Sequence, residues 1–117
     1  MIGFRGLEVD ERSPIVRDIR QGRVGGVVLF DRDLALESGE RNIRSPRQVR
    51  KLIARLQDAA AVPLLVAVDQ EGGMVARLKR KHGFPATVTA QSLGALDDPE
   101  ETRRRAGTIA AAMARAG

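Results

Sequence analysis

The sequence has no cysteine and a single histidine, His82. Disulfide bonds and thiolate metal sites are therefore excluded within these residues, and a histidine-rich metal cluster cannot form. Tyrosine and tryptophan are also absent, and there are only three phenylalanines. The aromatic stacking platforms on which many nucleic-acid-binding domains depend are therefore scarce.

Long clusters of charges of one sign are also largely missing. The net charge is +5, but the arginines are interleaved with acids, as in "VRDIRQGR" and "FDRDLALESGER". This spacing favours a solvated basic face, and we expect no nucleic-acid partner. A basic nucleic-acid-binding domain stays open as an alternative, and salt-dependent binding to DNA or RNA would reveal it.

No apolar run approaches the length of about 20 residues that a membrane-spanning helix needs. The N-terminus "MIGFRGLEVD" lacks the charged-then-apolar layout of a signal peptide. We therefore expect a cytoplasmic protein with no membrane partner. With 43% hydrophobic and 30% charged residues, a chain of 117 residues is long enough for one small domain or for a piece of a larger one.

Three segments begin with a capping residue followed by proline, which is a helix-start signal. They are residues 13–22, 45–61 and 98–117, with starts at Ser13–Pro14, Ser45–Pro46 and Asp98–Pro99. In the second segment, Gln48 completes a predicted capping box. Apolar residues at helical spacing predict the inner faces: Ile15, Val16 and Ile19; Val49, Leu52, Ile53 and Leu56; Ala106, Ile109, Ala110 and Met113.

Short apolar runs lie between these helices. "VGGVVLF" (24–30) and "VPLLVAV" (62–68) do not alternate with polar residues, so both faces should be buried, as in parallel strands. "MIGF" (1–4) is a weaker first strand. The order predicts an α/β fold of repeated βα units with right-handed crossovers. A complete barrel of this type needs about 250 residues, so the chain predicts either a small open sheet or, as we favour, the first part of a (β/α)8 barrel.

The connections after the strands are long, at 31–44 and 70–97, and ligands bind at that end of parallel strands. Asp69 directly follows a strand, and Glu71 would lie about 6.6 Å further along an extended chain, near the spacing of glycosidase carboxylate pairs. Gly72 and Gly73 would allow close approach of backbone to a ligand. Arg77 would supply a rigid fork of donors for sugar hydroxyls or a carboxylate.

Structural roles compete with each of these assignments. Asp69 is equally well explained as a loop-capping acceptor, and Glu71 as a structural residue paired with an arginine. The glycine pair is a turn in most proteins, and "EGGMVAR" lacks the Lys-Ser/Thr of a phosphate-binding loop.

Two other polar groups are weaker candidates. Asp31 and Asp33 in "FDRD" repeat the pattern of a strand followed by an acid, and two carboxylates are a weak signal for a cation site. His82 is most simply a loop histidine.

The motifs "GGVVLFDRD", "NI", "LLVAVDQEGGMVARL" and "GFP" together resemble glycoside hydrolase family 3, in particular its β-N-acetylhexosaminidase branch. The resemblance runs over nearly the whole chain, so residues 1–117 would form part of that family's N-terminal domain. It implies a (β/α)8 barrel, of which the chain would hold about three βα units. It also implies a retaining hydrolase, without cofactor or metal, that removes terminal β-linked N-acetylglucosamine.

In that family the nucleophile is a downstream aspartate, and a His-Asp pair on a mobile loop is the acid/base. The resemblance therefore implies no catalytic residue in this chain. Asp69 matches the aspartate that binds hydroxyls of the terminal sugar, Arg77 matches an arginine of the same subsite, and Glu71 becomes a structural residue. Met74 departs from the family, which has arginine after "EGG". A non-catalytic module that binds carbohydrate or an anion remains the alternative.

Overall fold

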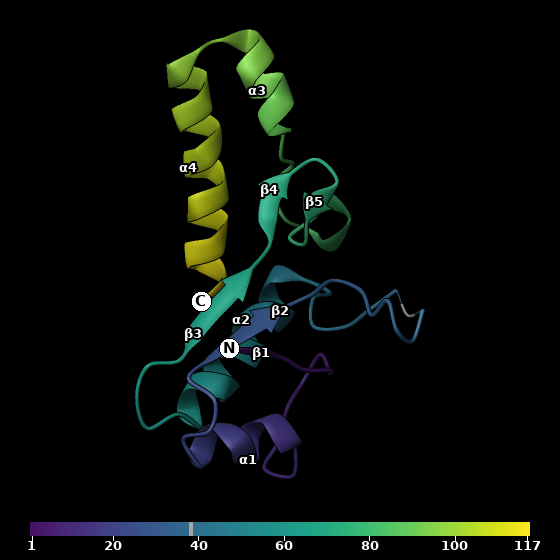
Figure 1. Cartoon of the computed structure of the whole chain (residues 1–117), viewed down its shortest axis with the longest axis vertical. Helices are drawn as coiled ribbons and strands as arrows, with labels where there is room; N and C mark the ends of the chain where they lie inside the picture. The colour runs from purple at the N-terminus through teal and green to yellow at the C-terminus, as the bar shows by residue number, and fades with distance from the viewer. Residues whose placement is uncertain (38) are drawn as a thin grey trace.

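The computed structural model describes residues 1–37 and 39–117. Its centre is a sheet of three parallel strands in the order β1-β2-β3 (Figure 1). The strands are β1 (Ile2–Gly3), β2 (Gly26–Leu29) and β3 (Leu65–Val68). The parallel βα arrangement predicted from the sequence is confirmed, although the strands are shorter than predicted.

Two helices pack on one face of this sheet and begin where the sequence predicts. They are α1 (Pro14–Arg20) and α2 (Pro46–Asp58). The Ser45 hydroxyl accepts a hydrogen bond from the backbone N–H of Gln48 at 3.2 Å. The Gln48 side chain accepts from the N–H of Arg44 and not of Ser45, so the predicted capping box is displaced by one residue.

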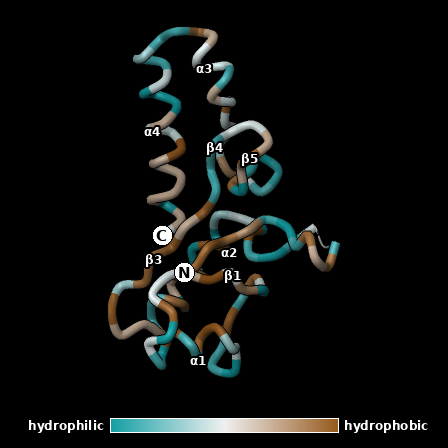
Figure 2. Tube along the Cα trace, in the orientation of Figure 1, coloured by the Kyte–Doolittle hydropathy of each residue, from teal (hydrophilic) through white to brown (hydrophobic). Residues whose placement is uncertain are grey.

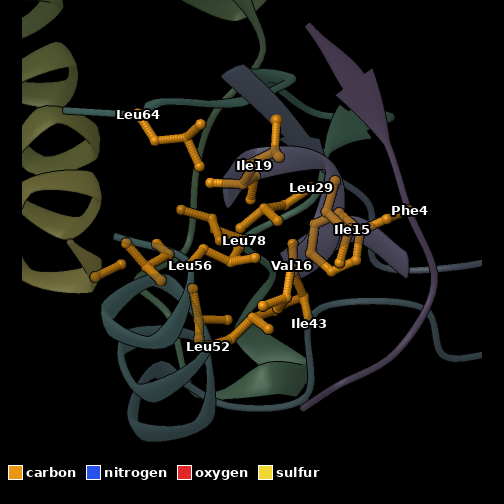
Figure 3. Packing of buried hydrophobic residues seen from close by; sticks show 14 of the residues in the cluster. Phe4, Ile15, Val16, Ile19, Leu29, Ile43, Leu52, Leu56, Leu64 and Leu78 are labelled. Carbon is orange, nitrogen blue, oxygen red and sulfur yellow. The ribbon is translucent and has the colours of Figure 1, made fainter. Parts of the chain in front are cut away.

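The core lies between these helices and the sheet, and side chains from α1, α2, β2 and the chain after β1 meet there (Figure 3). The predicted inner faces of α1 and α2 are all buried: Ile15, Val16, Ile19, Val49, Leu52, Ile53 and Leu56. Val27 and Leu29 of β2 meet them from the sheet, and Phe84 closes the cluster from a distant loop. Burial of such side chains contributes about 1.5–3 kcal/mol each before entropy is counted, so this layer holds the fold together.

The prediction that both faces of β3 are buried is wrong. Leu65 is 68% exposed, and the other three residues of β3 are half-buried. Val66 and Val68 pack against the core from one face of this edge strand, whereas Leu65 belongs to the opposite face, which is not covered in the same way. In β2, by contrast, three of the four residues are buried.

The long segment after β3 contains structure that the sequence did not predict. It includes a hairpin, a 3₁₀ turn and a short helix: β4 (Gln70–Gly72), β5 (Val75–Ala76), η1 (Arg80–His82) and α3 (Ala90–Leu96). The hairpin turns at Gly73 and Met74, so the predicted turn at the glycine pair is confirmed. Gly72 has a φ of 90°, and a Cβ there would lie 2.1 Å from the carbonyl oxygen of Val88. This close approach requires glycine.

The last helix, α4 (Pro99–Ala116), begins at the predicted cap, where the Asp98 carboxylate accepts the N–H groups of Glu100 and Glu101. Its predicted inner stripe is largely wrong, because Ala106, Ala110 and Met113 are exposed. Ala112 and Ala116 are the buried residues, since α4 packs on α2 near its C-terminal end and its first turns rise beyond the sheet beside α3 (Figure 1). Figure 2 shows this helix as mixed in hydropathy, whereas β2 and β3 are hydrophobic. Within the described residues no helix is long and apolar enough to cross a membrane.

Candidate functional site

The two predicted sugar-binding residues meet at the C-terminal end of β3. Arg77 Nη2 lies 3.3 Å from Asp69 Oδ2. The Asp69 side chain is 51% exposed, whereas that of Arg77 is 19% exposed. An exposed carboxylate beside a nearly buried guanidinium presents hydrogen-bond acceptors and donors on the same surface, which suits a hydroxylated ligand.

Gln70 locks the backbone around this pair. The N–H of Arg77 donates to the Asp69 carbonyl at 3.2 Å and to Gln70 Oε1 at 2.9 Å. Gln70 Oε1 also accepts from the N–H of Leu78 at 2.8 Å, and Gln70 Nε2 donates to the carbonyl of Leu78. The side chain therefore bridges both arms of the hairpin. This role could not be predicted from the sequence, because nothing near Gln70 indicates its partners seven and eight residues away.

Behind Arg77 lies the end of β2. The Arg77 guanidinium carbon is 5.9 Å from the centre of the Phe30 ring, and Nη1 is 3.9 Å from Asp31 Oδ1. Asp31 is buried, and Lys79 forms a close ion pair with its other oxygen. Arg77 thus contacts an exposed carboxylate directly after β3 and a buried one directly after β2.

Asp31 and Asp33 do not form a cation site. Asp33 forms an ion pair with Arg5 and accepts the N–H groups of Ala35 and Leu36 at 3.1 and 3.2 Å. The hydrogen bond from Arg5 lowers the pKa of Asp33, against the opposing effect of burial. The two carboxylates have separate cationic partners, and among the described residues no group of three metal-ligating side chains occurs.

His82 lies in η1 with its side chain 11% exposed, and so it is more buried than a loop histidine. Its Nε2 is 4.0 Å from Asp31 Oδ2. Burial lowers the pKa of His82, nearby Lys81 lowers it further, and Asp31 opposes both. The imidazole is therefore neutral at pH 7, and it lies beside the Asp31 carboxylate without a formal charge.

Asn42 is a second scaffold residue that the sequence analysis did not assign. Its side chain is fully buried; it accepts the N–H of Phe30 at 3.1 Å and donates to the carbonyls of Phe4 and Gly6 at 3.3 and 3.1 Å. Its backbone N–H donates a hydrogen bond to the carbonyl of Phe30 at 2.8 Å. Asn42 thereby ties the end of β2 to the chain that follows β1.

Glu71 and Met74 both point away from this cluster. Glu71 is exposed, and the expected pairing with an arginine is absent among the residues that the structure describes. Met74 is 94% exposed at the hairpin turn. An arginine at that position would also extend into solvent in this chain.

A cavity of about 260 Å³ opens beside Arg77 at the end of β2. Its lining is Phe30, Asp31, Arg32, Asp33, Leu34, Ala35, Arg41 and Arg77. Two guanidiniums approach the Phe30 ring in this lining. The guanidinium carbon of Arg41 lies 4.7 Å from the ring centre, and that of Arg77 lies 5.9 Å from it. Since Asp31 and Asp33 are paired with cations, the groups left to a ligand are mainly donors.

Comparison with known proteins agrees with this geometry. A "Beta-hexosaminidase" of Xanthomonas euvesicatoria pv. vesicatoria (strain 85-10) is 39% identical over 117 residues, which cover 97% of this chain and 31% of that protein. A "Beta-hexosaminidase" of Xylella fastidiosa (strain M23) is 41% identical over 102 residues, covering 86% of this chain and 27% of that protein.

Among solved structures, NagZ from Neisseria gonorrhoeae in complex with N-trifluoroacetyl-D-glucosamine superimposes with a TM-score of 0.67 at 25% identity. That match covers 86% of this chain and 26% of the NagZ chain. The chain therefore spans about a third of the length of these relatives, and its α/β fold corresponds to part of their barrel domain. Residues 4–117 match the family described as "Glycosyl hydrolase family 3 N terminal domain", and the chain belongs to that family.

Proposed function

We propose that this chain supplies part of the terminal-sugar subsite of a retaining β-N-acetylhexosaminidase. The observation that carries the proposal is the Asp69–Arg77 pair, which lies 3.3 Å apart at the end of a parallel strand with the carboxylate half exposed. Family membership and a homologue crystallised with N-trifluoroacetyl-D-glucosamine support N-acetylglucosamine as the sugar.

In this proposal the two residues make complementary hydrogen bonds to the same sugar. Asp69 accepts hydrogen bonds from sugar hydroxyls, and Arg77 donates to sugar oxygens while neutralising Asp69. Bond cleavage falls to groups outside the 117 residues, because neither Asp69 nor Glu71 is arranged as half of a catalytic pair: Asp69 is held by Arg77 and Glu71 is turned to solvent. We place this activity in the cytoplasm and assign it no metal or cofactor.

A titration tests the binding role directly. N-Acetylglucosamine added to the ¹⁵N-labelled chain is expected to shift the resonances of Asp69 and Arg77, and Asp69→Ala should abolish the effect. Glu71→Ala is the matched control, since Glu71 is an exposed acid two residues away. Unchanged spectra at saturating sugar, or equal loss in both variants, would contradict the assignment.

The catalytic context needs a second experiment. A chimaera in which residues 1–117 replace the corresponding region of the Xanthomonas euvesicatoria relative should hydrolyse p-nitrophenyl N-acetyl-β-D-glucosaminide. The 117-residue chain alone should give no turnover above background. Turnover by the isolated chain would show that the roles are assigned wrongly.

The alternative, a non-catalytic module for a sugar or an anion, is favoured by one observation. The cavity beside Arg77 is lined by three arginines, and its two aspartates are already paired. A folded chimaera without hydrolytic activity, together with sugar or anion binding by the chain, would support this module in place of the glycosidase subsite.

A further inference from the structure

We propose that Asp31 is the positioning residue for Arg77, and that it holds this guanidinium in place from behind while the exposed face of Arg77 serves the ligand. The consequence for sugar affinity rests on the function proposed above. The effect on Arg77 itself does not.

The Asp31 side chain offers almost no surface to a ligand, although the residue belongs to the cavity lining. The Asp31 side chain is 2% exposed, whereas Asp69, which pairs with the other terminal nitrogen of Arg77, is 51% exposed. A buried carboxylate is retained only where cations compensate its desolvation. Here the compensation comes from one segment, since Arg77 and Lys79 lie within 4.0 Å of Asp31. The neutral His82 imidazole of the same segment lies 4.0 Å from the carboxylate.

This arrangement joins two loops that carry the candidate site. Asp31 follows β2, and its three neighbours follow β5, 46 or more residues later in the chain. Lys79 binds Oδ2, which leaves Oδ1 directed to Arg77. The Arg77 guanidinium therefore approaches Asp31 through Nη1, pairs with Asp69 through Nη2 and lies near the Phe30 ring.

The contact with Asp31 also has room to tighten. The Nη1–Oδ1 distance of 3.9 Å is longer than a hydrogen bond, and in the described part of the chain neither Asp31 Oδ1 nor Arg77 Nε has a hydrogen-bond partner. When a sugar hydroxyl engages Asp69, the Asp69–Arg77 pair weakens. A small movement of Nη1 toward Oδ1 then gives this buried oxygen a hydrogen bond, so Asp31 retains Arg77 in the site.

The chain offers a matched control in Asp33. It lies two residues from Asp31, is equally buried, and is paired with Arg5 and two backbone N–H groups. Among the described residues Asp33 forms its ion pair with Arg5 and none with Arg77. Removing its charge disturbs the same loop without touching the guanidinium.

The experiment measures Arg77 by ¹⁵N NMR in the 117-residue chain. Arg77 Nε is buried, so its proton should exchange slowly with water. In Asp31→Asn the exchange should accelerate about tenfold or more, because the guanidinium loses its rear support. Asp33→Asn should leave the Arg77 exchange within about twofold of the parent chain, and so should Lys79→Met, which retains Asp31.

The outcomes separate the proposal from a general loss of structure. Unchanged exchange in Asp31→Asn, or equal acceleration in Asp33→Asn or Lys79→Met, would overturn it. If Asp31→Asn does not fold by circular dichroism, Asp31→Glu replaces it. That longer carboxylate should shift the Arg77 Nε resonance while retaining slow exchange, and an unshifted resonance would also overturn the proposal.

A sugar titration of the same variants tests the consequence for binding. The dissociation constant for N-acetylglucosamine should rise about tenfold in Asp31→Asn and stay within about twofold in Asp33→Asn. If the parent chain binds no sugar, the proposed function fails while the Arg77 exchange data still decide the role of Asp31. If Asp31→Asn binds sugar as tightly as the parent chain, positioning by Asp31 has no functional consequence and the proposal fails.

Discussion

Two neighbouring strand ends carry the same pattern of an acid, one residue and a second acid, and the structure uses them in opposite ways. After β2, Asp31 and Asp33 are both buried and paired with cations from other segments. After β3, Asp69 and Glu71 are both exposed, and Asp69 pairs with Arg77. The β2 end is built as support, and the β3 end is presented to solvent.

The difference comes from distant partners and not from the acids themselves. Arg5 reaches Asp33 across 28 residues, and Lys79 reaches Asp31 across 48. At the β3 end the chain turns back at once as a hairpin, so the nearest partners are local and leave one side open. A strand-then-acid pattern therefore indicates the working face of a parallel sheet, but it does not distinguish a ligand-binding carboxylate from a supporting one.

The hairpin at the β3 end depends on glycine, and Gly72→Ala should have the largest effect on the molecule. The added Cβ would lie 2.1 Å from the Val88 carbonyl oxygen, at a φ of 90°. We expect a loss of about 3 kcal/mol in the free energy of unfolding, measured by urea denaturation. Gly94→Ala is the control: Gly94 lies in α3 with open space around it, so alanine should stabilise by up to about 1 kcal/mol. A neutral Gly72→Ala would show that the hairpin does not pack on Val88.

The β2 end should be most sensitive at Asn42. Asn42→Ala removes the acceptor for the Phe30 N–H and the donor to the Phe4 and Gly6 carbonyls, and these backbone groups would be left in the interior. We expect a loss of about 2 kcal/mol in the free energy of unfolding. Asn42→Asp, which retains the acceptor, should lose less than Asn42→Ala at neutral pH if the bond to Phe30 dominates. The opposite order would assign the larger share to the donated bonds.

Replacing one aspartate at each strand end tests the comparison itself. Asp31→Asn leaves Lys79 and Arg77 without a buried counter-charge, and we expect a loss of about 1.5 kcal/mol in the free energy of unfolding. Asp69→Asn breaks a half-exposed pair and should cost less than about 0.5 kcal/mol, while it removes sugar binding. Urea denaturation should therefore show the larger loss of stability in Asp31→Asn, and sugar titration should show the loss of the proposed binding in Asp69→Asn. Equal losses of stability would erase the distinction between the two ends.

Features that depend on neighbouring residues could be predicted from the sequence, whereas features that depend on contacts with distant segments could not. The starts of α2 and α4 and the parallel strands were predictable, because caps and apolar runs encode them locally. The start of α1 was also predicted, although the Ser13 side chain makes no capping hydrogen bond. The sugar-binding role of Asp69 and Arg77 stays a prediction. The inner stripe of α4 was not predictable, since its burial depends on how far the helix extends past the sheet. The roles of Gln70, Asn42 and Asp31 were missed for a related reason: each depends on which backbone or cation the fold brings to it.

The smallest expected effect is a pH dependence of the free energy of unfolding, caused by His82 near the end of β2. Its pKa is lowered in the folded chain, chiefly by burial, whereas a free imidazole titrates near about 6.5. The unfolded state therefore binds more protons in the window below 6.5, and stability should fall as the pH drops through that window and level off below the folded pKa. Urea denaturation between pH 7.5 and 5 should show this slope, and His82→Gln should flatten it. The pKa of Asp33 is also lowered, so its contribution is lost only as the pH falls below about 3.9, outside this range. A slope that persists in His82→Gln would mean that another titrating group carries the pH dependence, and the assignment of this effect to the buried imidazole would be wrong.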